Sequence, residues 1–299
     1  MNYILHLLIC LSMYVIASLS LNIVMGYAGL FSLAHASYLA VGAYTYAVLS
    51  IHGVGFVPAL LLAIGVSSLL SLAVSIPAWR YRGDFFVLAS LATQALISSV
   101  LYNWVKAGDP PGTLSNLTNG PSGIAGIHKP VIFGVGIDTM PRMAALSILL
   151  ALLCVAFARV LLKSPFGRMM QSLRDDELAA RALGKNMRLV KLQACAISCG
   201  LIAIAGVIYA FYQGYLDPSS SASLDFSILI ACMAIVGGTG NLWGPIVGAA
   251  ILLLLQEAPK FLPLSNSIAP NVRLIVYGVL LLFLMHLRPQ GVAGKYRFE

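Results

Sequence analysis

The densest group of ionisable side chains lies between Lys163 and Lys191, in the one long polar segment of an otherwise apolar chain. This segment carries seven basic and three acidic residues, a net charge of +4. The charged residues are Lys163, Arg168, Arg174, Asp175, Asp176, Glu177, Arg181, Lys185, Arg188 and Lys191. Side chains of both signs at this density can form ion pairs with another protein or with a charged membrane surface. The segment is therefore the first candidate for an interaction site.

Two helices must position these charges. The first shows the i, i+3, i+4, i+7 spacing of one apolar helical face, through Phe166, Met169, Met170 and Leu173. A second, short helix is predicted from about Asp175 to Leu183, with three acids in its first turn, where the helix dipole favours negative charge. Gly184 follows as the residue that ends this helix.

The second helix has a narrow, shallow apolar face, formed by Leu178, Ala179 and Ala182. A capped helix between two hydrophobic segments is suited to press against a partner protein. The alternative is a helix that lies on an anionic membrane surface. Three consecutive acids disfavour that alternative, because anionic lipid repels carboxylates. We therefore expect partner docking.

Residue patterns for catalysis or metal binding do not occur in the sequence. Carboxylates are too sparse for a paired general acid and base, and no cluster has metal-ligand spacing. Neither GxxxxGK[ST] nor GxGxxG is present. Cys195 and Cys199, one helical turn apart, could in principle ligate a metal. For both cysteines a role as small buried apolar residues is favoured over metal binding, because no histidine or carboxylate stands near them in sequence. We predict that the chain is not an enzyme.

Composition assigns the chain to the membrane. Hydrophobic residues make up 60% of its 299 residues, charged residues only 9%, and the mean hydropathy is +0.91. Soluble domains carry about 25% charged residues. The formal net charge of +8 lies in a few loops between apolar segments, as the positive-inside rule expects. The sequence has no basic face interleaved with aromatic residues, so nucleic acid is not an expected partner. From the composition we predict an integral membrane protein in contact with lipid.

The apolar segments predict an all-α, polytopic fold of about eight to ten transmembrane helices in a single domain, 1–299. Nine segments count as crossings: Ile4–Val24, Ala36–Ile51, Val57–Trp79, Phe85–Val105, Met143–Leu162, Leu192–Tyr212, Phe226–Val236, Ile246–Leu255 and Val272–Leu287. Basic residues place the 80–84 turn, the 163–191 loop and the 288–299 tail on the cytoplasmic side. The long loop 108–141, poor in lysine and arginine, is placed outside, and an odd number of crossings puts the N-terminus outside as well.

Two glycine-interrupted segments echo each other in the two halves of the chain, Gly26-x-x-Gly29 and Gly237-x-x-Gly240. The apolar segments on either side of the second pair are short, which indicates tilted or re-entrant helices. Such paired interruptions point to a transporter's substrate path, but glycine also serves close packing in membranes, and the sequence leaves both open. The candidate path residues are Gly26, Gly29, Ser32, His35, Gly237, Gly238 and Gly240. For His35 a hydrogen-bonded packing role is favoured over a pore-lining one.

Several stretches resemble one family in sequence and in order. ELAA at 177–180, followed by Gly184 in a basic loop, is similar to the EAA-type coupling motif of bacterial ABC importer permeases. The wider resemblance is to the branched-chain amino acid permease family, through LNIVMGYAGLFSLAHASYLAVGAY at 21–44, GRMMQSLRDDELAARALG at 167–184, GGTGNLWGPIVGA at 237–249 and RPQGV at 288–292. It covers nearly the whole chain.

The resemblance implies a permease subunit of an ATP-driven importer in the bacterial inner membrane, for branched-chain or other hydrophobic amino acids. It implies as partners a second homologous permease, two ABC ATPase subunits that hold ATP and Mg, and a periplasmic or surface substrate-binding protein. No cofactor is expected on this chain. The coupling role carries over to Arg174, Asp175, Asp176, Glu177, Ala179, Ala180 and Gly184. Importers of urea, short amides or small carboxylates share the pattern, and a self-contained channel is a remoter alternative.

Overall fold

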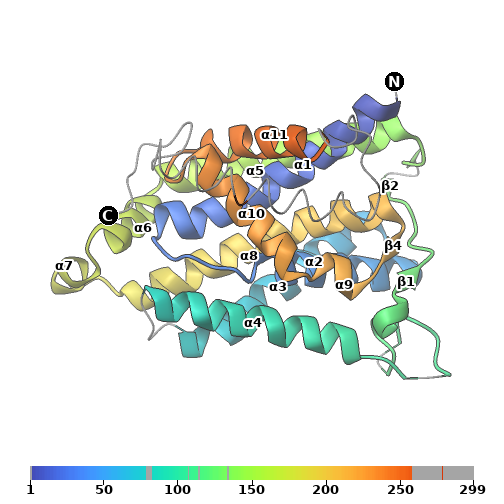
Figure 1. Ribbon diagram of the computed structural model, residues 1–299, viewed down its shortest axis with the longest axis horizontal. Helices are drawn as coiled ribbons and strands as arrows, with labels where there is room; N and C mark the ends of the chain where they lie inside the picture. The colour runs from blue at the N-terminus through green and yellow to red at the C-terminus, as the bar shows by residue number, and fades with distance from the viewer. Residues whose placement is uncertain are drawn as a thin grey trace.

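The computed structural model describes residues 2–78, 83–106, 108–113, 115–132, 135–257 and 278. Apart from short strands, the regular structure in these residues is helical (Figure 1). The elements begin with α1 (Asn2–Asn22), the π-helical turn η1 (Ile23–Tyr27), α2 (His35–Ile51), α3 (Phe56–Ala78), α4 (Asp84–Asn103), η2 (Gly120–Ser122), β1 (Ile124–Ala125), β2 (Val131–Ile132) and β3 (Val135–Gly136). They continue with α5 (Met140–Lys163), α6 (Pro165–Asp175), α7 (Glu177–Ala182), α8 (Met187–Gln213), β4 (Tyr215–Leu216), α9 (Pro218–Ser221), α10 (Leu224–Gly237) and α11 (Gly244–Glu257).

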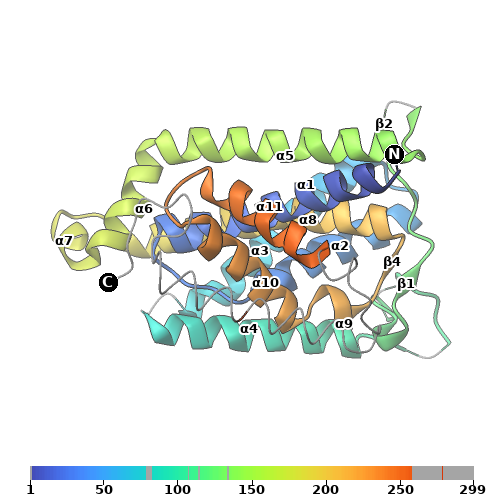
Figure 2. The ribbon, with the colours of Figure 1, turned by 45° about the horizontal axis from the view of Figure 1, so that its top comes forward.

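The long helices run between two ends of the molecule (Figures 1 and 2). We call the end that carries α6 and α7 the docking end, and the end that carries β1 to β4 the loop end. At the loop end β1 pairs antiparallel with β4, Ile124 opposite Leu216, which ties the long loop to the chain after α8. α1 begins at the loop end, where Tyr3 Oη donates to Glu257 Oε2 at 2.6 Å (Figure 1). The N-terminal helix therefore starts at the same end as the long loop, the arrangement that we predict.

The predicted spans agree with the helices in position but not in number. Within the described residues six helices are long and apolar enough to cross a membrane: Asn2–Tyr27, Phe56–Ala73, Phe85–Asn103, Met140–Lys163, Met187–Gln213 and Pro218–Gly237. The predicted segments Ala36–Ile51 and Ile246–Leu255 correspond to α2, of 17 residues, and α11, of 14. At about 1.5 Å per residue both fall short of a ~30 Å hydrocarbon core. The predicted span Val272–Leu287 and the 288–299 tail lie outside the described residues.

Helix α8 is the centre of the bundle. It packs against α1, α2 and α3, and a Cβ on Gly42 of α2 would lie 2.6 Å from the Cα of Ala203 in α8, so the two helices approach closely. Helices α4 and α5 lie along opposite flanks (Figure 2). Their outward side chains include Leu88, Leu152 and Val160, all exposed. Such a surface suits lipid tails, which are as apolar as leucine.

Candidate functional site

The predicted coupling segment forms two consecutive helices at the docking end, with α7 projecting farthest (Figure 1). The Ser164 hydroxyl caps α6 by accepting from the Gly167 N–H at 3.4 Å. Met170 and Leu173 are buried on one side of α6, which confirms the predicted apolar face. That face fixes α6 to the membrane-spanning helices, and α6 in turn carries α7.

The three consecutive acids occupy three different structural positions. Asp175 ends α6, and its Oδ1 lies 2.9 Å from Nη2 of Arg174. Asp176 is extended between the helices, and its Oδ1 accepts from two amides of the first turn of α7, at 2.8 and 3.0 Å. Only Glu177 lies within that turn. The predicted start of the second helix at Asp175 is therefore wrong: Asp176 is its N-cap, because a short carboxylate reaches the orphan N–H groups of a helix start.

Gly184 ends α7, as predicted from the sequence. Its φ is +76°, and its N–H donates to the Arg181 carbonyl at 2.9 Å. The Lys185 N–H donates to the Ala180 carbonyl at 3.3 Å. This pair of bonds is a Schellman closure, which requires a left-handed residue that glycine supplies without a Cβ penalty. Helix α7 is thus capped at both ends.

Two large apolar side chains are exposed at α7, Leu178 within the helix and Leu183 directly after it. Leu178 is 65% exposed and Leu183 80% exposed. Ala179 is also exposed, and it lines a groove of about 570 Å³ between α6 and α7. Ala180, in contrast, is only 5% exposed. Of the two alanines expected to face a partner, Ala179 is exposed, while Ala180 is largely buried at the wall of the same groove.

Glu177 fastens α7 to α8. Its carboxylate pairs with Arg181 one turn along and with Nζ of Lys191 in α8 at 3.0 Å. The side chain of Lys191 is 4% exposed and that of Glu177 10%. Taking both charges out of water is costly, and the cost is offset only while each keeps its partner. The pair therefore holds α7 in one orientation relative to the bundle.

The two glycine interruptions predicted from the sequence meet in space. Asn22, at the end of α1, is fully buried. Its Nδ2 donates to the Asn241 carbonyl at 2.9 Å, and its Oδ1 accepts from the Gly240 N–H at 3.1 Å. A Cβ on Gly26 would collide with the backbone nitrogen of Gly240. One amide side chain thus clamps the break after α1 to the break between α10 and α11.

Helices α10 and α11 form the short hairpin that we expect to be tilted or re-entrant. A Cβ on Gly237 would overlap the carbonyl oxygen of Gly244, and one on Gly248 would overlap that of Met233. Gly238 adopts φ +104° at the start of the turn. For this hairpin the close-packing interpretation of glycine therefore has direct geometric support.

Arg174 connects the docking helices to the first break. Its Nη1 donates to the carbonyl oxygen of Gly26 at 2.8 Å. A Cβ on Gly29, where φ is +70°, would lie 2.9 Å from Cγ of Arg174. Arg174, predicted as a coupling residue, therefore contacts both Gly26 and Gly29, predicted as path residues. The sequence does not reveal this contact.

His35 begins α2 and lies in a polar node between three helices. Its Nε2 is 2.9 Å from Oγ of Ser198 in α8, and that hydroxyl donates to the Ser20 carbonyl of α1 at 2.7 Å. Because Ser198 donates its one proton to Ser20, Nε2 of His35 is the donor of this bond. Nδ1 has no hydrogen-bond partner among the described residues. These bonds support a packing role for His35.

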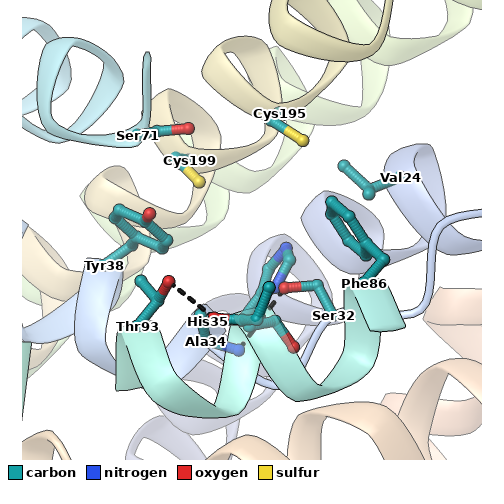
Figure 3. A pocket seen from close by; sticks show the side chains of 12 residues that line it. Val24, Ser32, Ala34, His35, Tyr38, Ser71, Phe86, Thr93, Cys195 and Cys199 are labelled. Atoms are coloured by element: carbon teal, nitrogen blue, oxygen red, sulfur yellow. Dashed lines mark hydrogen bonds between the residues drawn. The ribbon is translucent and has the colours of Figure 1, made fainter. Parts of the chain in front are cut away.

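His35 and Ser32 also line a cavity of about 30 Å³ between α2, α3, α4 and α8 (Figure 3). Cys195 and Cys199 form its α8 wall (Figure 3). Small-molecule sites measure roughly 300 to 1,000 Å³. The cavity therefore admits water-sized groups in this conformation and excludes an amino acid.

Sequence reasoning overlooks Asn22, Ser198 and Lys191. Asn22 carried a usable signal, because a lone amide in an apolar span must find hydrogen-bond partners. Ser198 has no distinguishing neighbour in the sequence. Lys191 continues the basic loop, and nothing in the sequence marks it as buried.

The chain matches, over residues 3–285, the family of the branched-chain amino acid transport system permease component. It is 29% identical to the high-affinity branched-chain amino acid transport system permease protein LivM of Salmonella typhimurium, over 95% of this chain and 68% of that protein. It is 25% identical to a probable LivM permease of Methanocaldococcus jannaschii, over 96% and 92%. The autoinducer 2 import system permease protein LsrC of Salmonella typhi is 26% identical over 57% of this chain and 46% of that protein. No solved structure matches.

The family match includes both helix breaks and the docking helices. The family consists of transport subunits, with the ATPase on partner chains, and not of enzymes. The chain therefore belongs to the branched-chain amino acid transport permease family and is a multi-pass membrane permease of the ABC importer type.

Proposed function

We propose that this chain forms the translocation path for branched-chain or other hydrophobic amino acids, and that α7 docks on an ABC ATPase subunit. The observation that carries the proposal is the form of α7. It is capped at both ends, projects at the docking end (Figure 1) and exposes Leu178 and Leu183. The buried ion pair between Glu177 and Lys191 braces it against the bundle. Because α7 is held rigidly against the bundle, a displacement of α7 by the ATPase moves the membrane helices, whereas a flexible loop would deform instead.

The substrate class is supported by the names of the LivM relatives and by the character of the cavity. Among the residues that the structure describes, no Asp, Glu, Lys or Arg lines the cavity beside His35. A zwitterion with an apolar side chain needs no fixed ion pair, because exposed backbone at broken helices can meet its ammonium and carboxylate. We assign Gly26, Gly29, Ser32, His35, Gly237, Gly238 and Gly240 to this path, with Ser32 and His35 favoured as cavity-lining residues.

In the proposed mechanism, closure of two ATPase subunits on ATP moves α6 and α7 as levers. The membrane helices of this chain and of a second permease then change from inward-open to outward-open around the path. A periplasmic or surface binding protein delivers the substrate at the loop end. ATP and Mg act on the ATPase subunits.

Docking is tested by co-purification of the ATPase subunits with the native chain and with Leu178→Glu/Leu183→Glu. Both leucines are exposed, so the changes should leave the bundle intact and abolish the association. Leu224→Glu is the control, since Leu224 is 44% exposed at the start of α10, next to α9, and α9 lies away from the docking end (Figure 1). Retention of the ATPases by the double variant would remove the docking role of α7. Failure of the native chain to retain them would remove the whole proposal.

The substrate class is tested separately, by uptake of labelled leucine into vesicles that contain the assembled importer. Isoleucine and valine should compete with leucine, whereas urea, acetamide and small carboxylates should not. Competition in the reverse order would replace the substrate class and leave the docking result untouched.

A further inference from the structure

We infer that Arg174 is the link through which a movement of α6 reaches both helix breaks, and that Asn22 carries this movement from the first break to the second. The inference rests on the proposed function, in which an ATPase moves α6 and α7. It goes further by naming a path of contacts inside this chain. The path runs from α6 through Arg174 to Gly26, and from Gly26 through Asn22 to Gly240.

The guanidinium of Arg174 holds two elements at once. Nε and Nη2 each lie 2.9 Å from Oδ1 of Asp175 in α6, and Nη1 lies 2.8 Å from the carbonyl oxygen of Gly26. The side chain is only 14% exposed. A planar fork of donors can serve two acceptors in fixed directions, whereas a lysine ammonium on a flexible stem cannot hold both so firmly.

The acceptor lies where the first span is easiest to deform. Gly26 is in the π-helical turn η1, where the α-helical hydrogen-bond ladder of α1 is interrupted. Carbonyl groups at such an end lack intrahelical donors, and Arg174 supplies one. Gly29 packs against the stem of the same side chain. A shift of α6, rigidly seated through Met170 and Leu173, must therefore pull or push this turn.

Asn22 transmits the shift to the second break because it is held on both sides. It accepts from the Gly240 N–H and donates to the Asn241 carbonyl. It is fully buried, and hydrogen bonds away from water are strong and directional. Gly26 leaves no room for the breaks to slide past each other, since a Cβ there would strike Gly240. The two breaks are expected to move as one unit.

The test compares coupling, measured as leucine transported per ATP hydrolysed, in vesicles with the assembled importer. Arg174→Met and Asn22→Ala should each retain the ATPase subunits and hydrolyse ATP, yet lower the coupling ratio at least ten-fold. Arg142→Met is the matched arginine control, since Arg142 is exposed near the start of α5, outside the docking helices, and bonds the Gly136 carbonyl. Ser12→Ala is the matched control in α1, since the buried Ser12 hydroxyl donates to the Leu8 carbonyl of its own helix. Both controls should keep the native ratio.

Each outcome decides a different point. A native coupling ratio in either variant would overturn the link. Loss of the ATPases from Arg174→Met would overturn it too, because Arg174 would then belong to the docking surface, while the proposed function would stand. The combined variant should be no worse than the poorer single one, since the two residues act in series. If Arg174→Met does not assemble, Arg174→Gln carries the same test, because a single amide cannot hold both Asp175 and Gly26.

Discussion

Glu177 shows how one carboxylate can serve both exposed and buried ion pairs. Arg181, its partner on the outer side, has a side chain that is 38% exposed. Lys191, its partner on the inner side, is almost fully enclosed. Exposed pairs stabilise proteins by about 0 to 1 kcal/mol, whereas removing one partner of a buried pair costs about 3 to 5 kcal/mol. The contribution of Glu177 to the free energy of unfolding therefore depends on the burial of its pair with Lys191, and not on the number of its pairs.

We predict that Lys191→Met lowers the free energy of unfolding by about 3 kcal/mol, because it leaves a carboxylate enclosed beside an apolar side chain. Arg181→Met should cost less than about 1 kcal/mol. Glu177→Gln combined with Lys191→Met should recover most of the loss, since no buried charge then remains unpaired: Arg181 loses its carboxylate partner, but its side chain is 38% exposed to water. Thermal unfolding of the purified protein in detergent measures all three. Equal unfolding midpoints for the two single variants would show that the pair with Lys191 stabilises the protein no more than the pair with Arg181.

At the level of elements, the hairpin of α10 and α11 depends on glycine for contact and not for flexibility alone. Gly248 sits where any side chain would overlap the Met233 carbonyl of the facing helix. Gly65, in the interior of α3, is its opposite: a Cβ there would meet nothing within 4 Å. Two glycines in apolar helices therefore have different roles that their sequence contexts do not distinguish.

We predict that Gly248→Ala destabilises the protein by about 1 to 3 kcal/mol, because the hairpin must open to admit the methyl group. Gly65→Ala should stabilise it by roughly 0.4 to 1 kcal/mol, because alanine restricts the unfolded chain and fits the helix. The two midpoints of thermal unfolding should lie on either side of the native value. A Gly248→Ala protein as stable as the native one would refute the close contact.

Local patterns in the sequence predict local structure in this chain. Apolar spacing predicts the buried side of α6, and Gly184 predicts the end of α7, because both depend on neighbouring residues. The start of α7 lies at Glu177, two residues after the predicted start at about Asp175, since any of three consecutive acids can cap a helix. The meeting of Gly26 with Gly240, and the burial of Lys191, depend on how distant helices pack. No local pattern contains that information.

For the whole molecule, the 17-residue helix α2, too short for a full crossing, decides where the interior can open. Its first amides find partners on other helices: the Ala36 N–H donates to Ser227 Oγ of α10 at 3.0 Å, and the Ser37 N–H to Gln94 Oε1 of α4 at 3.1 Å. The start of α2 is thus anchored between α4 and α10. The cavity beside it measures about 30 Å³, so passage of an amino acid requires these helices to separate.

This requirement predicts a change in the reactivity of native cysteines during transport. Cys195 and Cys199 line the cavity, and both are buried. Labelling by N-ethylmaleimide, read by mass spectrometry of the peptides, should be slow at rest. It should rise several-fold when ATP, leucine and the binding protein drive the assembled importer, because the separated helices admit the reagent. Cys232 is equally buried on α10 but does not line the cavity, so its labelling should stay constant. If Cys195 and Cys199 respond no more than Cys232, the cavity beside His35 does not open during the cycle, and Ser32 and His35 must be removed from the path.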